Sequence, residues 1–172
     1  EIMKLCKSYR STFEITDFSQ RIQTNHELEP IIRHGEPPAI LRFEDVKQEI
    51  LGIFSIISSF KKSGYTSLGI VCKTETQARE LSESLRVHTG DIHFLSNQSS
   101  AFMKGIIVTS SHMAKGLEFD EVIVPYVNAK NYNSAIDKSM LYVAVTRAMH
   151  RLTLTYNGRP SEFIPVSSDQ NF

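Results

Sequence analysis

Two hydrophobic patterns alternate along the chain. Runs of consecutive apolar residues, typical of strands buried on both faces of a sheet, predict strands at 39–43, 67–72, 92–95, 105–109, 121–124 and 152–156. Between these runs apolar residues recur every three or four positions, as they do on the buried face of a helix. This second pattern predicts helices at about 11–26, 45–62, 74–89 and 137–150.

Capping residues mark where the predicted helices begin. Ser11 with Glu14, and Thr74 with Gln77, fit the capping box, in which two side chains satisfy free backbone N–H groups at a helix start. Asp45 and Asp137 are the N-caps that we expect for the other two helices. These boundaries agree with the ones that the periodicity predicts.

The alternation of strand and helix predicts an α/β fold with a mainly parallel sheet and helices on both faces. We expect one domain over residues 1–157, followed by a tail at 158–172 that is rich in Pro and Ser. In open sheets of this type, ligands bind at the carboxyl ends of the strands. The polar connections that follow the strands are therefore the first places to look for a site.

Composition narrows the classes of protein. Nineteen basic and nineteen acidic residues give zero net charge, which argues against a dedicated nucleic-acid wrapper but not against a local basic patch. Cys6 and Cys72 form no C-x-x-C, and the six histidines show no metal-ligand spacing, so we expect neither a disulfide framework nor a metal site. Since no apolar run approaches the ~18 residues of a membrane span, we expect a cytoplasmic protein without membrane contact.

The common phosphate-binding motifs are missing. Gly64 and Gly69 have the separation of a G-x-x-x-x-G-K-[ST] loop, but Ile70 stands where lysine is needed. The chain also contains no G-x-G-x-x-G. It therefore lacks the parts that hold Mg²⁺ and the β- and γ-phosphates of a nucleotide.

Three phrases carry a more specific signal. KSYRSTFEI (7–15), SSHMAKGLEFDEVIV (110–124) and MLYVAVTRAMHRLTL (140–154) resemble, in this order, motifs IV, V and VI of the UvrD/Rep-like superfamily 1 DNA helicases. CKTETQARELSESL (72–85) looks like the strand-to-helix step between the first two motifs. Within the family the chain resembles the helicase IV (HelD-like) branch, in which no extra domain separates motifs IV and V.

This resemblance implies a RecA-like (P-loop NTPase-type) fold without a P-loop of its own: the C-terminal domain (2A) of a two-domain motor. An N-terminal RecA-like domain of the same polypeptide would supply the P-loop and the Mg²⁺ ligands. The implied cofactor is ATP with Mg²⁺, and the implied substrate is single-stranded or partly duplex DNA. The intact chain would be an ATP-dependent DNA helicase or translocase, and the isolated domain would be inactive.

The resemblance also assigns residues to the nucleotide. Arg10 and Arg147 would reach the γ-phosphate, Tyr9 would stack on adenine, and Glu118 would accept a hydrogen bond from the ribose. Gly116 would allow close approach of the backbone. From the residues alone the alternatives stay open: a surface salt bridge for Arg10, a structural ion pair for Arg147, and a packing role for Tyr9.

The same resemblance places Ser110, Ser111, His112 and Lys115 on the DNA. Ser110 and Ser111 could equally cap a short helix, and His112 and Lys115 could be ordinary solvated side chains. The family often has Thr at one of the serine positions. It also usually has acidic and arginine residues where this chain has Asp137-Lys138-Ser139, so no role is carried over to those three.

A function of a different class stays open as well. HelD-like proteins include factors that act on RNA polymerase, so the chain could be a non-catalytic interaction module with structural arginines and RNA polymerase as its partner. A phosphate loop encoded upstream in the same gene would favour the motor, and its absence would favour the module.

Overall fold

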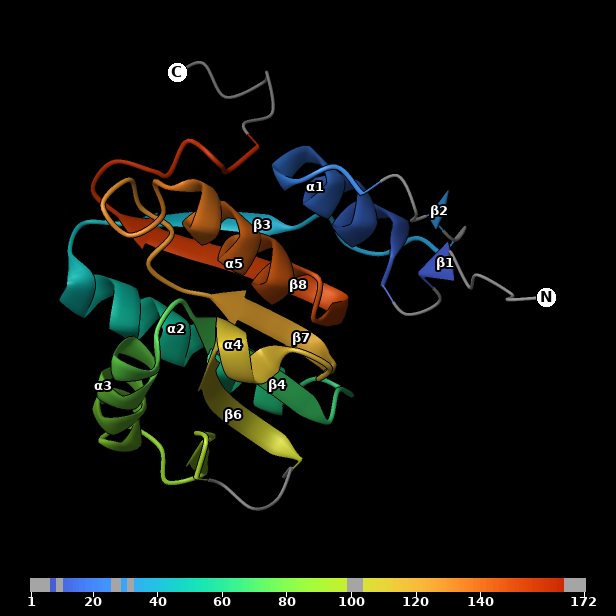
Figure 1. The fold of residues 1–172 in the computed structure, drawn as a ribbon. Coiled ribbons are helices and arrows are strands. Elements are labelled where there is room, and N and C mark those ends of the chain that lie inside the picture. The colour runs from blue at the N-terminus through green and yellow to red at the C-terminus, as the bar shows by residue number, and fades with distance from the viewer. Residues whose placement is uncertain (1–6, 9–10, 26–28, 31–32, 99–103, 166–172) are drawn as a thin grey trace.

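The fold is described from a computed structural model, which covers residues 7–8, 11–25, 29–30, 33–98 and 104–165 (Figure 1). Tyr9 and Arg10 lie outside these residues. No helix of the described part is long and apolar enough to cross a membrane. Two strands of two residues, β1 (Lys7–Ser8) and β2 (Glu29–Pro30), pair with each other, apart from the main sheet.

The main sheet has six strands, and every paired neighbour is parallel. In spatial order the strands are β3 (Ala39–Phe43), β8 (Ala148–Asn157), β7 (Phe119–Val124), β4 (Ser67–Cys72), β6 (Gly105–Ser110) and β5 (Ile92–Phe94). The predicted parallel α/β fold is confirmed. Strands β7, β4 and β6 contribute side chains to core clusters on both faces, which is why they are continuous apolar runs in the sequence.

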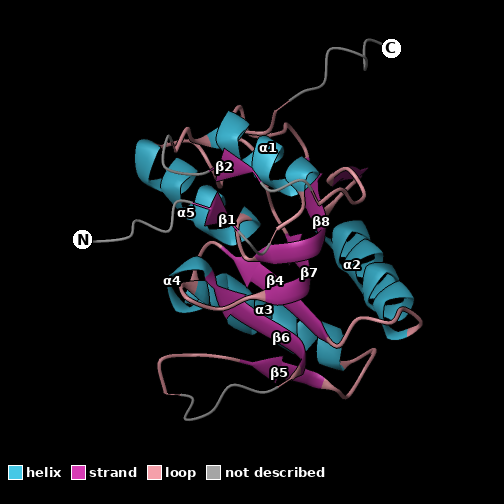
Figure 2. Cartoon of the chain, turned by 90° about the vertical axis from the view of Figure 1, so that its right-hand side faces the viewer, coloured by secondary structure: helices cyan, strands magenta, loops and turns pink. Residues whose placement is uncertain are grey.

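The helices divide between the two faces of the sheet. On one face, α1 (Phe13–Ile22), α4 (Ser111–Ala114) and α5 (Ala135–Val145) share a core cluster with Val122 and Val124 of β7. On the other, α2 (Val46–Lys61) and α3 (Glu75–Arg86) share a cluster with Ile70 and Ile123. Figure 2 shows α5 and α2 on opposite sides of the sheet.

Two of the predicted helix starts are confirmed. The Thr74 hydroxyl accepts from Gln77 N at 3.2 Å, and Gln77 Oε1 accepts from Thr74 N at 3.4 Å, which completes the capping box of α3. The Asp45 carboxylate caps α2 by accepting from Gln48 N at 2.8 Å.

The predicted start of α1 is wrong by one residue. Thr12, not Ser11, is the N-cap, and its hydroxyl accepts from Ile15 N at 3.4 Å. The Ser11 hydroxyl instead donates to the carbonyl of Ala148 at 2.6 Å. Glu14 does not close a capping box, because its carboxylate accepts from Gly35 N and pairs with His34.

The predicted helix 137–150 is wrong at both ends. Ser134 is the N-cap of α5 and forms a capping box with Asp137, which lies in the first turn instead of capping it. The helix ends at Val145 with Thr146 as its C-cap: Thr146 N donates to the carbonyl of Tyr142 at 3.1 Å, and the Thr146 hydroxyl donates to the carbonyls of Tyr142 and Val143. Arg147 therefore lies in the turn before β8 and not on the flank of a helix.

The connection between β6 and β7 is short. Residues 111–118 leave the carboxyl end of β6, form α4 with Ser110 as N-cap, and enter β7 at Phe119, two residues earlier than predicted. Strand β4 lies between β6 and β7, so this connection crosses one face of the sheet. Parallel crossovers usually need a dozen or more residues. The polar residues that stand between these two strands in the sequence therefore lie on this crossing.

On the other face, the Glu49 side chain of α2 is fully buried. Its carboxylate accepts from Tyr126 N at 2.9 Å, from the Thr155 hydroxyl at 2.8 Å and from the Asn157 amide at 2.6 Å. Tyr126 has φ 60°, so the carboxylate also stabilises a backbone conformation that is uncommon for a residue other than glycine. Glu49 thus fixes α2 to the carboxyl ends of β7 and β8.

The described residues after β8 pack against the domain. Pro160 forms an isolated bridge with Asn128, and the Ser161 hydroxyl donates to the carbonyl of Tyr132 at 2.7 Å. Ile164 is buried in the same core cluster as α1 and α5. Residues 158–165, expected to be a tail, therefore cover the connection that follows β7.

The close packing around Gly69 of β4 allows a prediction about stability. A β-carbon at Gly69 would lie 2.4 Å from Cδ2 of the buried Phe119 ring. We expect Gly69→Ala to lower the free energy of unfolding by about 1–3 kcal/mol, the usual cost of overpacking a core. Gly64→Ala is the matched control, since a β-carbon there meets no atom within 4 Å. Urea unfolding measures both, and equal stability of the two variants would contradict a fixed Phe119 ring.

Candidate functional site

The three phrases singled out in the sequence meet where β8 begins. Phe119 N donates to the carbonyl of Arg147 at 3.0 Å, and Thr12 N donates to that of Met149 at 3.2 Å. Between them, the Ser11 hydroxyl donates to the carbonyl of Ala148 at 2.6 Å. Three successive carbonyls are thus held by segments that lie far away in the sequence.

A cavity of about 300 Å³ opens beside this junction. Ser11 and Thr16 line it from the α1 side, Tyr142 and Arg147 from the α5 side, and Glu118 from the end of the crossing. The structure therefore brings together Glu118 and Arg147, two of the residues predicted to contact a nucleotide. Tyr9 and Arg10, also predicted to do so, directly precede Ser11 in the sequence, but their own positions are outside the described residues.

Arg147 is half-buried and its guanidinium is held in place. Nε donates to the carbonyl of Val143 at 3.1 Å, Nη2 to the Thr146 hydroxyl at 3.2 Å, and Nη1 to the carbonyl of Leu117 at 3.5 Å. The side chain therefore bridges the last turn of α5 and the end of the crossing. A guanidinium fixed in this way, at the wall of a cavity, is suited to meet an anion that enters it.

The position of this cavity differs from the general expectation for open α/β sheets. Glu118 directly precedes β7 and Arg147 directly precedes β8, so both lie at the amino ends of their strands. The predicted ligand position was the carboxyl ends. Glu118 lies at the opposite edge because the crossing starts at the carboxyl edge of β6 and ends at the amino edge of β7.

Gly116 lies within the crossing and has φ +80°. A β-carbon there would meet no atom within 4 Å, so its conformation, and not lack of space, favours glycine. The change of direction at Gly116 separates Lys115 from Glu118, which faces the cavity.

The residues predicted to contact DNA lie at the other end of the crossing and divide into two pairs. Ser110 and Ser111 are buried: the Ser110 hydroxyl caps α4, and the Ser111 hydroxyl donates to the carbonyl of Cys72 at 3.2 Å. His112 and Lys115 are exposed and line a groove of about 200 Å³ between α4 and α5. Two of the four side chains are therefore accessible to a ligand, and the two serines position them.

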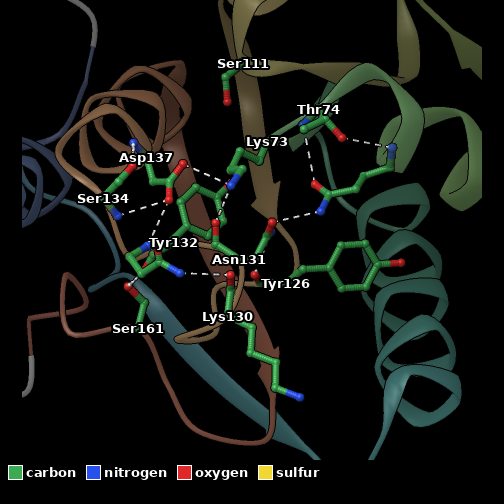
Figure 3. A network of polar contacts seen from close by, with 12 residues as sticks. Lys73, Thr74, Ser111, Tyr126, Lys130, Asn131, Tyr132, Ser134, Asp137 and Ser161 are labelled. Carbon is green, nitrogen blue, oxygen red and sulfur yellow. Dashed lines mark hydrogen bonds and ion pairs between the residues drawn. The ribbon is translucent and has the colours of Figure 1, made fainter.

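A polar network beside α5, shown in Figure 3, was not predicted from the sequence. Lys73, directly after β4, pairs with the Asp137 carboxylate at 2.9 Å and donates to the carbonyl of Asn131 at 2.5 Å. The Asn131 side chain in turn accepts from Gln77 and donates to the carbonyl of Tyr126. The network joins α3, α5 and the connection after β7. The only hint in the sequence was a lysine placed directly after a buried strand.

The Asp137 carboxylate is the charged centre of this network. Burial alone would raise its pKa, but hydrogen bonds from Asn133 N, Lys73 and Ser134 outweigh burial and lower the pKa from 3.8 to about 2. The ionised form is therefore the one that the fold stabilises.

The two acids of the Asp120-Glu121 pair have structural partners. Asp120 accepts from Thr66 N at 2.9 Å and from Ser67 N at 3.2 Å. Glu121 is buried, which raises its pKa, although Arg151 at 3.5 Å opposes that rise. Across the described ranges no group of three or more His, Cys, Asp or Glu side chains could hold a metal ion.

Asp137 gives a pH-dependent prediction. Because its folded pKa is lower than its unfolded value, the ionised carboxylate stabilises the fold above pH 4, and this contribution is lost as the pH falls from about 4 to about 2. At pH 7 we expect Asp137→Asn to lower the free energy of unfolding by about 2 kcal/mol, since Lys73 loses its partner. The difference from wild type should shrink at pH 3 and below.

Asp17→Asn is the control for this experiment, because the Asp17–Arg21 pair is exposed and should contribute less than about 1 kcal/mol. Urea unfolding at both pH values measures the effect. A difference for Asp137→Asn that does not change with pH would contradict the role of the charge.

Comparisons with known proteins show what this chain and its fold are similar to. Residues 105–155 match the family model of the UvrD-like helicase C-terminal domain. The fold is similar to the C-terminal domain of a possible DNA helicase from Lactobacillus plantarum WCFS1, with a TM-score of 0.78 and 28% identity over 91% of this chain and 92% of that one. An arterivirus nonstructural protein 10 (helicase), solved with DNA, has a TM-score of 0.49 and 14% identity over 70% of this chain and 28% of its own. No curated protein sequence matches.

The chain thus has the α/β fold of a helicase C-terminal RecA-like domain, and its segment 105–155, from β6 into β8, matches the UvrD-like helicase C-terminal domain.

Proposed function

We propose that this chain is the second RecA-like domain (2A) of an ATP-dependent DNA helicase or translocase. One observation carries the proposal: Glu118 and Arg147 line the same cavity as Ser11, which follows Tyr9 and Arg10 in the sequence. Each of the three segments resembles a different nucleotide-contacting motif. Convergence of all three on one cavity is what a shared ligand requires.

In this function the cavity faces the phosphates of ATP, held by a P-loop on the N-terminal RecA-like domain of the same polypeptide. Mg²⁺, bound by that domain, supplies charge neutralisation at the phosphates. Arg147 and Arg10 add positive charge at the γ-phosphate, where negative charge develops as the bond breaks. Tyr9 stacks on adenine, and Glu118 accepts a hydrogen bond from the ribose.

The groove between α4 and α5 faces single-stranded or partly duplex DNA in this proposal. His112 and Lys115 are exposed there and contact backbone phosphates. Because the chain has zero net charge, DNA binding by the domain alone is weak and depends on few contacts. The same crossing, residues 111–118, reaches both the groove and the nucleotide cavity, which gives a direct route between the two ligands.

Within the family we propose the helicase IV-like branch, since motifs IV and V are joined here without an inserted domain. We also propose that the protein is cytoplasmic. A non-catalytic module that binds RNA polymerase is the second candidate. One observation favours it: the Arg147 guanidinium donates to Val143, Thr146 and Leu117, as a purely structural arginine would.

Arg147→Lys in the full-length protein separates the two candidates. Lysine keeps the charge but not the planar fork that matches phosphate oxygens. We expect ATP turnover to fall ~10³-fold or more, as for other arginine fingers, while nucleotide affinity stays within a few-fold. Steady-state ATPase kinetics and nucleotide titration measure the two effects.

The control for Arg147→Lys is a thermal melt, which must stay close to wild type so that unfolding does not explain the loss. Arg151→Lys, a nearby arginine that pairs with Glu36 and Glu121 outside the cavity, is the matched variant and should keep turnover. Near-normal turnover of Arg147→Lys would contradict the motor and favour the interaction module.

DNA contact by Lys115 can be tested through salt dependence. If Lys115 neutralises one phosphate, Lys115→Ala in the full-length protein should weaken binding and lower the slope of log K against log salt by about 0.7, the value for one contact on a single strand. Fluorescence anisotropy with an oligonucleotide measures the slope. Lys62→Ala, an exposed lysine at the end of α2, should leave it unchanged. An unchanged slope for Lys115→Ala would remove Lys115 from the DNA interface.

A further inference from the structure

We propose that Ser11 is a positioning residue for Arg147: its hydroxyl fixes the backbone that carries the arginine and so sets the place of the guanidinium in the cavity. This inference rests on the proposed function, because it concerns how Arg147 is presented to a nucleotide.

The Ser11 hydroxyl makes a long-range contact. It donates to the carbonyl of Ala148 at 2.6 Å across 137 residues of sequence, and Ser11 is only 8% exposed. It has no part in starting α1, because Thr12 caps that helix. A serine that is not a cap, yet is buried with its hydroxyl on a distant carbonyl, stabilises the junction between two segments and not its own helix.

The contact adds a further restraint to the backbone around Arg147. Arg147 N donates to the carbonyl of Ala144 at 3.2 Å, and the Arg147 carbonyl accepts from Phe119 N at 3.0 Å. These bonds fix the residue toward α5 and toward β7. The next peptide, which begins β8, is fixed by Ser11 through the Ala148 carbonyl. Thr12 N still holds the Met149 carbonyl one residue further on, so without the Ser11 bond we expect a small shift of the turn, and the guanidinium shifts with it.

Small displacements matter at this place. A misplacement of ~1 Å of a catalytic group can cost ~10²-fold in rate, because the reacting groups no longer hold their geometry. Ser11→Ala removes the donor and leaves a buried carbonyl without that partner. The binding contacts of the nucleotide, which the P-loop domain would mainly supply, are left in place. The effect should therefore appear in turnover and not in affinity.

The experiment is the ATPase activity of the full-length protein with substitutions at Ser11. We expect Ser11→Ala to lower kcat about 10- to 100-fold with KM for ATP within about two-fold. Ser11→Thr keeps the hydroxyl, its added methyl can enter the cavity of about 300 Å³ that Ser11 lines, and kcat should return to within a few-fold of wild type. Ser82→Ala is the matched control: Ser82 is a buried serine of α3 whose hydroxyl donates to the carbonyl of Arg79 in its own helix.

A double-mutant cycle separates positioning from general stability. If Ser11 acts through Arg147, Ser11→Ala should reduce kcat little further once Arg147→Lys is present. Two losses that multiply would show that Ser11 acts independently of Arg147 and would overturn the inference. Wild-type kcat for Ser11→Ala would overturn it too, while a large effect of Arg147→Lys in the same assay would leave the proposed function standing. Near-normal kcat for Arg147→Lys would contradict both the inference about Ser11 and the proposed function.

Discussion

The return of the chain from β6 to β7 is the constraint on which the rest of this structure depends. Two parallel strands must be joined across the full height of the sheet, and here residues 111–118 do so with β4 in between. There is no room for the usual long crossover helix. The segment therefore lies close to the sheet beside α5, turns at Gly116 and places one end at each edge. A longer connection would allow the groove near His112 and the cavity near Glu118 to move independently.

Much of the fold could be predicted because its determinants are local. Buried parallel strands are apolar runs, and the Thr74 box or the Asp45 cap acts within four residues. The errors arise where residues that are distant in the sequence determine where a helix begins or ends. Ser11 and Thr12 are both good N-caps, and the choice depends on the Ala148 carbonyl, which takes the Ser11 hydroxyl. Likewise the apolar pattern continues through Ala148, so periodicity alone cannot show that the helix has ended at Val145.

The candidate site was predictable only as a set of residues. Motif order indicated Glu118 and Arg147, but it gave neither their shared cavity nor its position at the amino edge of the sheet. It also could not show that the Ser110 and Ser111 hydroxyls bond to the backbone, or that Lys73 and Asp137 form a partly buried ion pair. These contacts join segments that only the sheet topology brings together, so they leave no periodic trace in the sequence.

The buried Glu49 carboxylate has a consequence for how the chain is made. Its three donors, on Tyr126, Thr155 and Asn157, come 77, 106 and 108 residues later in the sequence. Strand β3, just before Glu49, likewise has β8 as its neighbour in the described sheet. During synthesis on the ribosome, the Glu49 carboxylate therefore cannot gain all three donors until β8 has emerged. The first half of the domain therefore cannot complete its packing before the second half has been made. Contacts of such long range slow folding, and they leave apolar strands exposed in the nascent chain until β8 has been made.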